Sequence, residues 1–99
     1  MGKFDFSVFD DEITNAIKSM KLTFSSHELI LEIAQNNQSQ YINALIAYKQ
    51  TGRPFLYVHQ QLSIRLKKYE GDTIKNIGIK PSKDIFGKSN TCLYWEKII

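Results

Sequence analysis

The sequence predicts a mainly α-helical domain of about four helices that ends in a β-hairpin, and three observations support this. Apolar residues recur with the 3.6-residue period of amphipathic helices through most of residues 8–69. Two later segments, residues 73–79 and 91–98, are rich in Ile, Thr, Tyr and Trp, which are common in strands. The length of 99 residues suits one domain, residues 1–99, since two would have about fifty residues each, near the lower limit for a stable core.

The first predicted helix covers residues 8–20. Ser7 and Asp10 are both residue types that cap a helix start, and four apolar residues then follow on one face. Residues 21–24 are too few for another helix, so we expect a short extended link there. The apolar stripe of this first helix consists of Ile13, Ala16, Ile17 and Met20.

Two more helices are predicted before residue 51. Ser25 and Glu28 match the S-x-x-E capping box, which marks the start of a helix that ends near residues 36 and 37. Ser39 can cap a third helix that ends near Gln50, because Gly and Pro follow. We expect its inward side chains to be those of Tyr41, Ile42, Leu45 and Ile46.

A fourth helix and the hairpin complete the prediction. Pro54 suits the first turn of a helix that continues to residue 69, although residues 55–58 alone would also fit a strand. The tip of the hairpin, residues 80–90, contains three lysines, and residues 81–84 resemble a capped single helical turn. The inward side chains of the fourth helix would be Phe55, Val58, Leu62, Leu66 and Tyr69.

Charge is distributed unevenly along the chain, whose formal net charge is +3. Residues 1–48 carry three basic and six acidic residues, whereas residues 49–99 carry ten basic and four acidic residues. Such an imbalance is typical of a surface that binds a polyanion, because clustered positive charge attracts phosphate groups. Lysines that only solubilise the second half of the chain would produce the same imbalance.

The sequence gives no indication of catalysis, a cofactor or a metal. Cys92 is the single cysteine, so neither an internal disulfide nor a cysteine-rich zinc site is expected. We expect His27 in the first turn of its helix and His59 as a hydrogen-bonded structural residue. The tripeptide at residues 87–89 resembles the end of a phosphate-binding loop, but residue 82 is Ser where that motif requires Gly. We therefore expect a protein that is not an enzyme.

The chain also has no apolar stretch long enough to cross a bilayer and no apolar segment near its start. These observations favour a cytoplasmic location and no membrane partner.

The order of helix, extended link, two or three helices and terminal hairpin resembles the winged helix-turn-helix superfamily of DNA-binding domains. The closest local match is residues 52–69, GRPFLYVHQQLSIRLKKY, and the order of elements matches over nearly the whole chain. The resemblance implies that one helix enters the major groove and that the hairpin, or wing, touches the backbone or minor groove. Three helices usually precede the wing, whereas four are predicted here, so the helix-turn-helix unit is either residues 25–51 or residues 39–69.

The outward face of the fourth helix is suited to reading DNA. Gln can bond to adenine, Ile can contact a thymine methyl group, and Lys can bind phosphate. The predicted DNA-binding residues are Arg53, Tyr57, Gln60, Gln61, Ile64, Lys67, Lys68, Lys80, Lys83 and Lys88. The competing third helix offers Gln38, Gln40, Asn43 and Lys49.

The resulting functional prediction is sequence-specific binding of double-stranded DNA by a regulator of transcription or of a mobile element. A homodimer on a palindromic site is expected, since symmetric half-sites commonly give small domains their specificity. Ile85 and Phe86 either fold back over the hairpin or are presented to a DNA groove. Two alternatives remain open: a protein-interaction module that uses Tyr57, Ile64 and the wing, and RNA binding by the same basic face.

Overall fold

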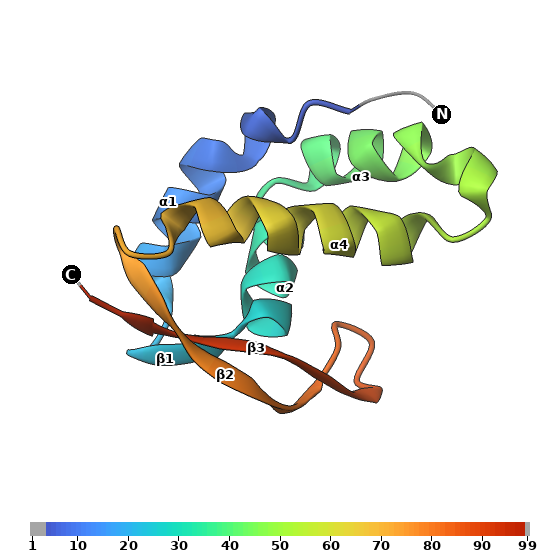
Figure 1. Ribbon diagram of the computed structural model, residues 1–99. Helices are drawn as coiled ribbons and strands as arrows, with labels where there is room; N and C mark the ends of the chain where they lie inside the picture. The colour runs from blue at the N-terminus through green and yellow to red at the C-terminus, as the bar shows by residue number, and fades with distance from the viewer. Residues whose placement is uncertain (1–3, 99) are drawn as a thin grey trace.

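The computed structural model describes residues 4–98 and contains four α-helices and a three-stranded antiparallel sheet (Figure 1). The α-helices are α1 (Asp10–Ser19), α2 (Ser26–Asn36), α3 (Gln38–Ala47) and α4 (Pro54–Leu66). The strands are β1 (Thr23–Ser25), β2 (Ile74–Lys83) and β3 (Ser89–Lys97). Short 3₁₀ helices, η1 (Phe6–Phe9), η2 (Lys49–Thr51) and η3 (Lys67–Tyr69), extend or link the α-helices.

The sheet has three strands, in the order β1-β3-β2, where the sequence predicted a two-stranded hairpin. The expected extended link is strand β1, in which Phe24 pairs with Trp95 of β3. Three residues are too few to show an alternating pattern, and the partner strand lies far away in the sequence. The local sequence therefore indicated an extended segment but not its pairing with β3.

The β2–β3 hairpin is longer, and its tip shorter, than predicted. Lys80 to Lys83 continue β2 and pair with Ser89 to Cys92, so the expected helical turn at residues 81–84 is wrong. Pro81 fits this strand because β2 is an edge strand, where a residue without an N–H group is tolerated. The register shifts between Asn76 and Ile79, and Gly78 within this bulge has a φ of 106°, a conformation that favours glycine.

The helix boundaries follow several of the predicted capping signals. The capping box of α2 is present: the Ser25 Oγ accepts from the Glu28 N–H at 3.0 Å, and Glu28 accepts from the Ser25 N–H. Pro54 is at the first turn of α4, as predicted. Asp5, rather than Ser7 or Asp10, caps the N-terminal helical segment, by accepting from the Ser7 N–H.

The observed boundaries of α3 and α4 differ from the predicted ones. Helix α3 begins at Gln38 instead of after a Ser39 cap and ends at Ala47, with η2 following. The α-helical part of the fourth helix ends at Leu66, and the 3₁₀ helix η3 follows it to Tyr69, where the predicted helix ended.

One hydrophobic core joins the helices to the sheet. Trp95 is completely buried, and its Nε1 donates to the Oγ of Ser26, which in turn donates to the Leu93 carbonyl. Arg65 forms two hydrogen bonds of 2.8 and 2.6 Å to the Asp10 carboxylate, which tie α4 to α1. No helix within residues 4–98 is both long and apolar enough to cross a membrane.

The orientation of α3 corrects another prediction, that of its inward side chains. Tyr41 and Ala44 are buried and Leu45 is half-buried, but Ile42 and Ile46 are 53% and 62% exposed. Ala44 occupies the inward position that the sequence had assigned to the larger isoleucines. A small side chain allows close approach of packed helices, so the buried face of α3 is centred on a residue that hydrophobicity alone does not favour.

Candidate nucleic-acid interface

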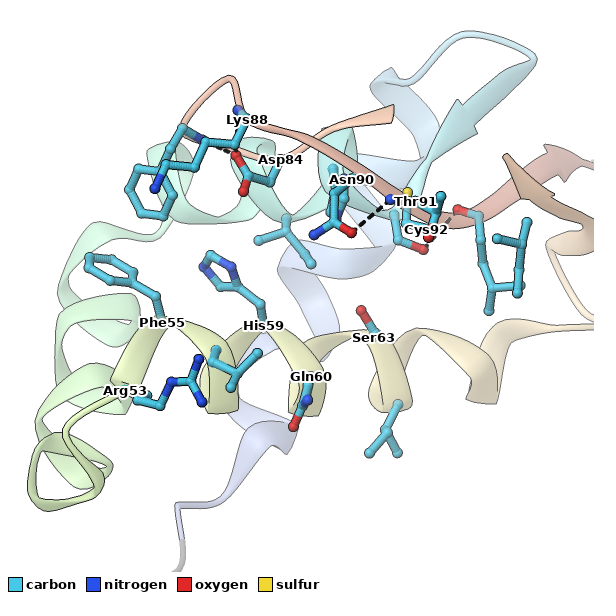
Figure 2. Close-up of a pocket in the computed structure, with 18 of the residues that line it drawn as sticks. Arg53, Phe55, His59, Gln60, Ser63, Asp84, Lys88, Asn90, Thr91 and Cys92 are labelled. Atoms are coloured by element: carbon cyan, nitrogen blue, oxygen red, sulfur yellow. Dashed lines mark hydrogen bonds between the residues drawn. The ribbon is translucent and has the colours of Figure 1, made fainter. Parts of the chain in front are cut away.

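A groove of about 840 Å³ lies between α4 and the β2–β3 hairpin, with the start of α2 as its third wall (Figure 2). Figure 2 shows Phe55, His59 and Ser63 pointing from α4 toward the hairpin, while Arg53 and Gln60 lie farther from it. Asn90 and Thr91 of β3 line the opposite wall. The groove is thus formed by segments that are widely separated in the sequence.

The groove brings together half of the predicted DNA-binding residues. Gln60, Ile64 and Lys67 lie at intervals of four and three residues, so they form one row of α4 along the rim of the groove. Arg53 lies just before the helix, and Lys88 lies across the groove at the hairpin tip. This set therefore combines three cations with one amide and one apolar side chain.

The other predicted residues do not line the groove. Tyr57 and Gln61 belong to the adjacent row of α4, where the Tyr57 ring stacks on Tyr48 at 6.3 Å and Gln61 is half-buried. Lys80 lies over the Tyr94 ring at 5.5 Å. Lys68 and Lys83 are exposed, but they too lie outside the groove lining. The outward face predicted for α4 was thus wider than the part of the helix that lines the groove.

Phe86 of the hairpin tip contacts the first turns of α4. Its ring meets Phe55 edge-on at 4.9 Å between centroids and stacks on His59 at 6.5 Å. Phe55 and Phe86 are 42% and 56% exposed, so the prediction of an inward Phe55 is wrong. Ile85 packs against the core, which agrees with the alternative in which the tip folds back. Phe86 thus lines the groove beside the first turns of α4 while about half of its surface stays exposed.

His59 is a structural residue, as the sequence predicted. Its Nε2 lies 2.6 Å from the Tyr41 hydroxyl, which links α4 to α3. Burial, with a smaller contribution from the charge of His27, lowers the pKa of His59 to about 4. Burial also raises the pKa of Tyr41 to about 12. Both side chains are therefore neutral at pH 7, and the pair fixes the position of the groove wall.

Positive charge dominates the groove. Arg53, Lys67 and Lys88 line it together with a single carboxylate, that of Asp84. The Asp84 carboxylate accepts hydrogen bonds from the backbone N–H groups of Lys88 and Phe86, which lower its pKa. This carboxylate thus serves to shape the turn, and the three cations face the solvent.

Several lining residues were not predicted from the sequence. Ser26 and His27 reach the groove through the packing of α2 against the hairpin, whereas Asn90 and Thr91 are placed there by the pairing of β3 with the outer half of β2. The His27 Nδ1 lies 3.4 Å from the Ser82 hydroxyl, a contact between distant segments that no local pattern indicates.

The chemical groups of the groove are suited to binding. Hydroxyl, amide and guanidinium groups can hydrogen-bond a polar ligand, and the cations can neutralise phosphate. Cys92 is a free, half-buried thiol at the groove wall. Within residues 4–98, no group of three or more His, Cys, Asp or Glu side chains is placed to hold a metal ion.

Comparisons of the chain with protein-family models, with curated proteins and with solved structures found no match. Function is therefore inferred from the side chains of the groove and their surroundings.

Proposed function

We propose that the protein is a winged helix-turn-helix protein that binds double-stranded DNA sequence-specifically, as a regulator of transcription or of a mobile element. The observation that carries this proposal is the groove rim, where Arg53, Lys67 and Lys88 surround Gln60 and Ile64. The cations would bind backbone phosphates, while Gln60 and Ile64 would contact base edges. The order of the helices and the strand order β1-β3-β2 are compatible with a helix-and-wing layout.

Helix α4 is the proposed recognition helix. It flanks the groove beside the hairpin and ends close to Lys67, so base-reading and phosphate-binding groups lie on one surface. Helix α3, the competing candidate, contains no charged residue and lies on the other side of α4 from the hairpin (Figure 1). We therefore assign the helix-turn-helix unit to residues 39–69.

Fluorescence anisotropy with a labelled duplex of random sequence, at about 50 and about 200 mM salt, tests the proposal. The triple variant Arg53→Ala, Lys67→Ala, Lys88→Ala should bind more weakly and reduce the slope of log affinity against log salt by about 0.9 for each lost phosphate contact. The matched control is Lys18→Ala, Lys21→Ala, Lys49→Ala, which removes the same charge from exposed sites outside the groove. Equal losses in the two triple variants would contradict a groove-centred site.

A protein partner is the second candidate, and the apolar side chains of the groove favour it. Leu56, Ile64 and Ile79 line the groove and are 39%, 56% and 69% exposed. An apolar interface loses little affinity with added salt, whereas a phosphate interface loses much. No binding to duplex DNA at low salt would reject the DNA proposal and favour this candidate. Competition by duplex RNA at equal strength would assign the basic surface to RNA instead.

A further inference from the structure

Aromatic side chains of α4 and of the hairpin tip meet in the groove. The Phe86 ring lies edge-on to Phe55 at 4.9 Å between centroids and stacks on His59 at 6.5 Å. We define Phe55, His59 and Phe86 as the aromatic cluster, and all of them line the groove. Phe55 and Phe86 are 42% and 56% exposed, so each ring keeps apolar surface in contact with water. A planar group that stacked on these rings would remove that surface from water.

Each exposed ring of the aromatic cluster has a cation close to it in the chain. Arg53 lies two residues before Phe55, is exposed and lines the same groove. Lys88 lies two residues after Phe86 and is likewise exposed in the groove lining. In the part of the chain that the structure describes, neither cation forms a salt bridge. Asp84 adds one carboxylate, so positive charge outweighs negative charge around the cluster, which suits an anionic ligand.

The turn at the hairpin tip fixes the backbone that carries Phe86 and Lys88. The Asp84 Oδ1 accepts hydrogen bonds from the N–H groups of both residues, at 2.9 and 3.0 Å. The Asp84 N–H donates to the Lys88 carbonyl at 2.9 Å, which closes the turn. A ring and a cation on an ordered backbone lose less conformational entropy when a ligand binds. The tip is therefore suited to a ligand that combines a planar ring with an anionic group.

A nucleobase with its phosphate combines these properties. Its face stacks on aromatic side chains, its phosphate binds Arg and Lys, and its edge forms hydrogen bonds. The Asn90 Oδ1 accepts from the Thr91 N–H at 2.8 Å, so the NH₂ group of Asn90 is the donor that this groove wall offers to a base edge (Figure 2). Bases within a duplex are covered on both faces by their neighbours, so only an unpaired base has a face for Phe55 or Phe86.

We infer that the aromatic cluster binds an unpaired nucleobase, which stacks on Phe86 and Phe55 while Arg53 and Lys88 bind its phosphate groups. The inference deepens the proposed function, on which it rests for the presence of nucleic acid in the groove, by adding a site for one unstacked base beside the duplex. A single-stranded overhang and a free nucleotide offer the same chemistry. Separate measurements distinguish these two sources.

Fluorescence anisotropy with two labelled DNAs tests the overhang. Both consist of the same duplex with a short single-stranded overhang, placed at either strand end in turn, which holds adenines in one DNA and abasic sites in the other. The two DNAs carry the same number of phosphates, so the ratio of their affinities isolates the bases. Stacking on aromatic side chains should make the adenine overhang bind about five- to a hundredfold more tightly than the abasic one.

Variants that remove a ring locate the site. Phe86→Leu and Phe55→Leu keep an apolar side chain without a ring, so the affinity ratio should fall toward one, whereas Phe86→Trp should retain it. Tyr57→Leu is the matched control and should keep the wild-type ratio, because Tyr57 is an exposed aromatic residue of α4 outside the groove lining. Circular dichroism checks that each variant is folded. A ratio that survives in both Leu variants of the cluster, or that Tyr57→Leu loses equally, would overturn the inference.

A titration with deoxyadenosine monophosphate, followed by the NMR signals of the Phe86 and Gly87 amides, tests the free nucleotide. Micromolar binding that Phe86→Leu abolishes would support the inference with a free nucleotide as the ligand. A wild-type preference for the adenine overhang with only millimolar nucleotide binding would support it with a DNA strand as the ligand. An affinity ratio of one, together with no micromolar nucleotide binding, would overturn the inference.

A blunt duplex and an adenine single strand, measured in parallel, separate this inference from the proposed function. If the blunt duplex binds but neither the adenine overhang nor the nucleotide depends on the Phe86 ring, the inference alone fails. If the single strand binds through the aromatic cluster but the blunt duplex does not bind, the proposal of duplex recognition alone fails.

Discussion

His59 illustrates how one buried side chain makes stability depend on pH. Its pKa is lowered from 6.5 to about 4 in the folded protein, mainly by burial. The unfolded chain therefore binds more protons than the folded chain between these two values, and stability falls as the pH drops through this window. The lowered pKa values of Asp10 and Asp84 act at lower pH, because their ordinary value is 3.8.

We predict that urea unfolding of the wild type at pH 4.5 gives a lower free energy of unfolding than at pH 7. The variant His59→Gln should lose most of this difference, since it has no titrating group at that position. His27→Gln should retain most of it, because His59 is still present. A pH dependence that survives unchanged in His59→Gln would show that another group is responsible.

Gln60 and Gln61 are neighbours in the sequence, yet they have different surroundings. Gln60 is exposed and lines the groove, whereas Gln61 is half-buried in the adjacent row. If α4 reads DNA, Gln60→Ala should weaken the preference for particular A·T base pairs by about 1 to 3 kcal/mol. Gln61→Ala serves as the matched control and should leave the preference unchanged, although the sequence predicted a role for both.

Selection of binding sites from a random library, followed by sequencing, measures this preference. Loss of preference in Gln61→Ala alone would show that the other row of α4 faces the bases. Loss in Gln40→Ala or Asn43→Ala would instead assign recognition to α3.

At the scale of the elements, the contact of Phe86 with α4 determines how firmly the hairpin tip is held. The Phe55–Phe86 pair is edge-on at 4.9 Å, and such pairs contribute about 0.5 to 1.5 kcal/mol. Phe86→Ala should therefore leave the global free energy of unfolding within about 1 kcal/mol while it speeds local opening of the tip by up to about tenfold.

Amide hydrogen exchange at Gly87, whose N–H donates to the Asp84 carbonyl, reports this opening. Ile79→Ala is the control, because Ile79 is an exposed apolar residue of β2 outside the aromatic contact. Faster exchange at Gly87 in both variants would show that the hairpin as a whole, and not the Phe86 contact, controls the tip.

Helices were easier to predict than strands, because helix signals are local in the sequence and strand partners are not. Ser25 with Glu28, and Pro54 at the first turn of α4, act through neighbouring backbone atoms, so the local sequence contains the whole signal. β1 and the outer half of β2 depend on cross-strand partners, such as Trp95 for Phe24 and Asn90 for Ser82. Local patterns cannot predict those partners.

The groove could be predicted in part for the same reason. Gln60, Ile64 and Lys67 follow from the period of one helix, and their common row was contained in the predicted outward face of α4. Of the opposite wall only Lys88 was predicted, because the positions of Asn90 and Thr91 depend on how far the strands extend. The exposed isoleucines of α3 were also missed, since hydrophobicity alone assigned Ile42 and Ile46 to the core.

For the whole molecule, the central position of β3 has a consequence for synthesis on the ribosome. β3 lies between β1 and β2; Phe24 pairs with Trp95, and the Ser26 hydroxyl bonds to Trp95 and Leu93, both of them in β3. The nascent chain can therefore form helical turns early, but Phe24 must wait for a partner strand that is made about seventy residues later. During that interval the apolar surface of the emerging helices remains uncovered. We therefore expect aggregation to threaten the nascent chain more than the finished protein.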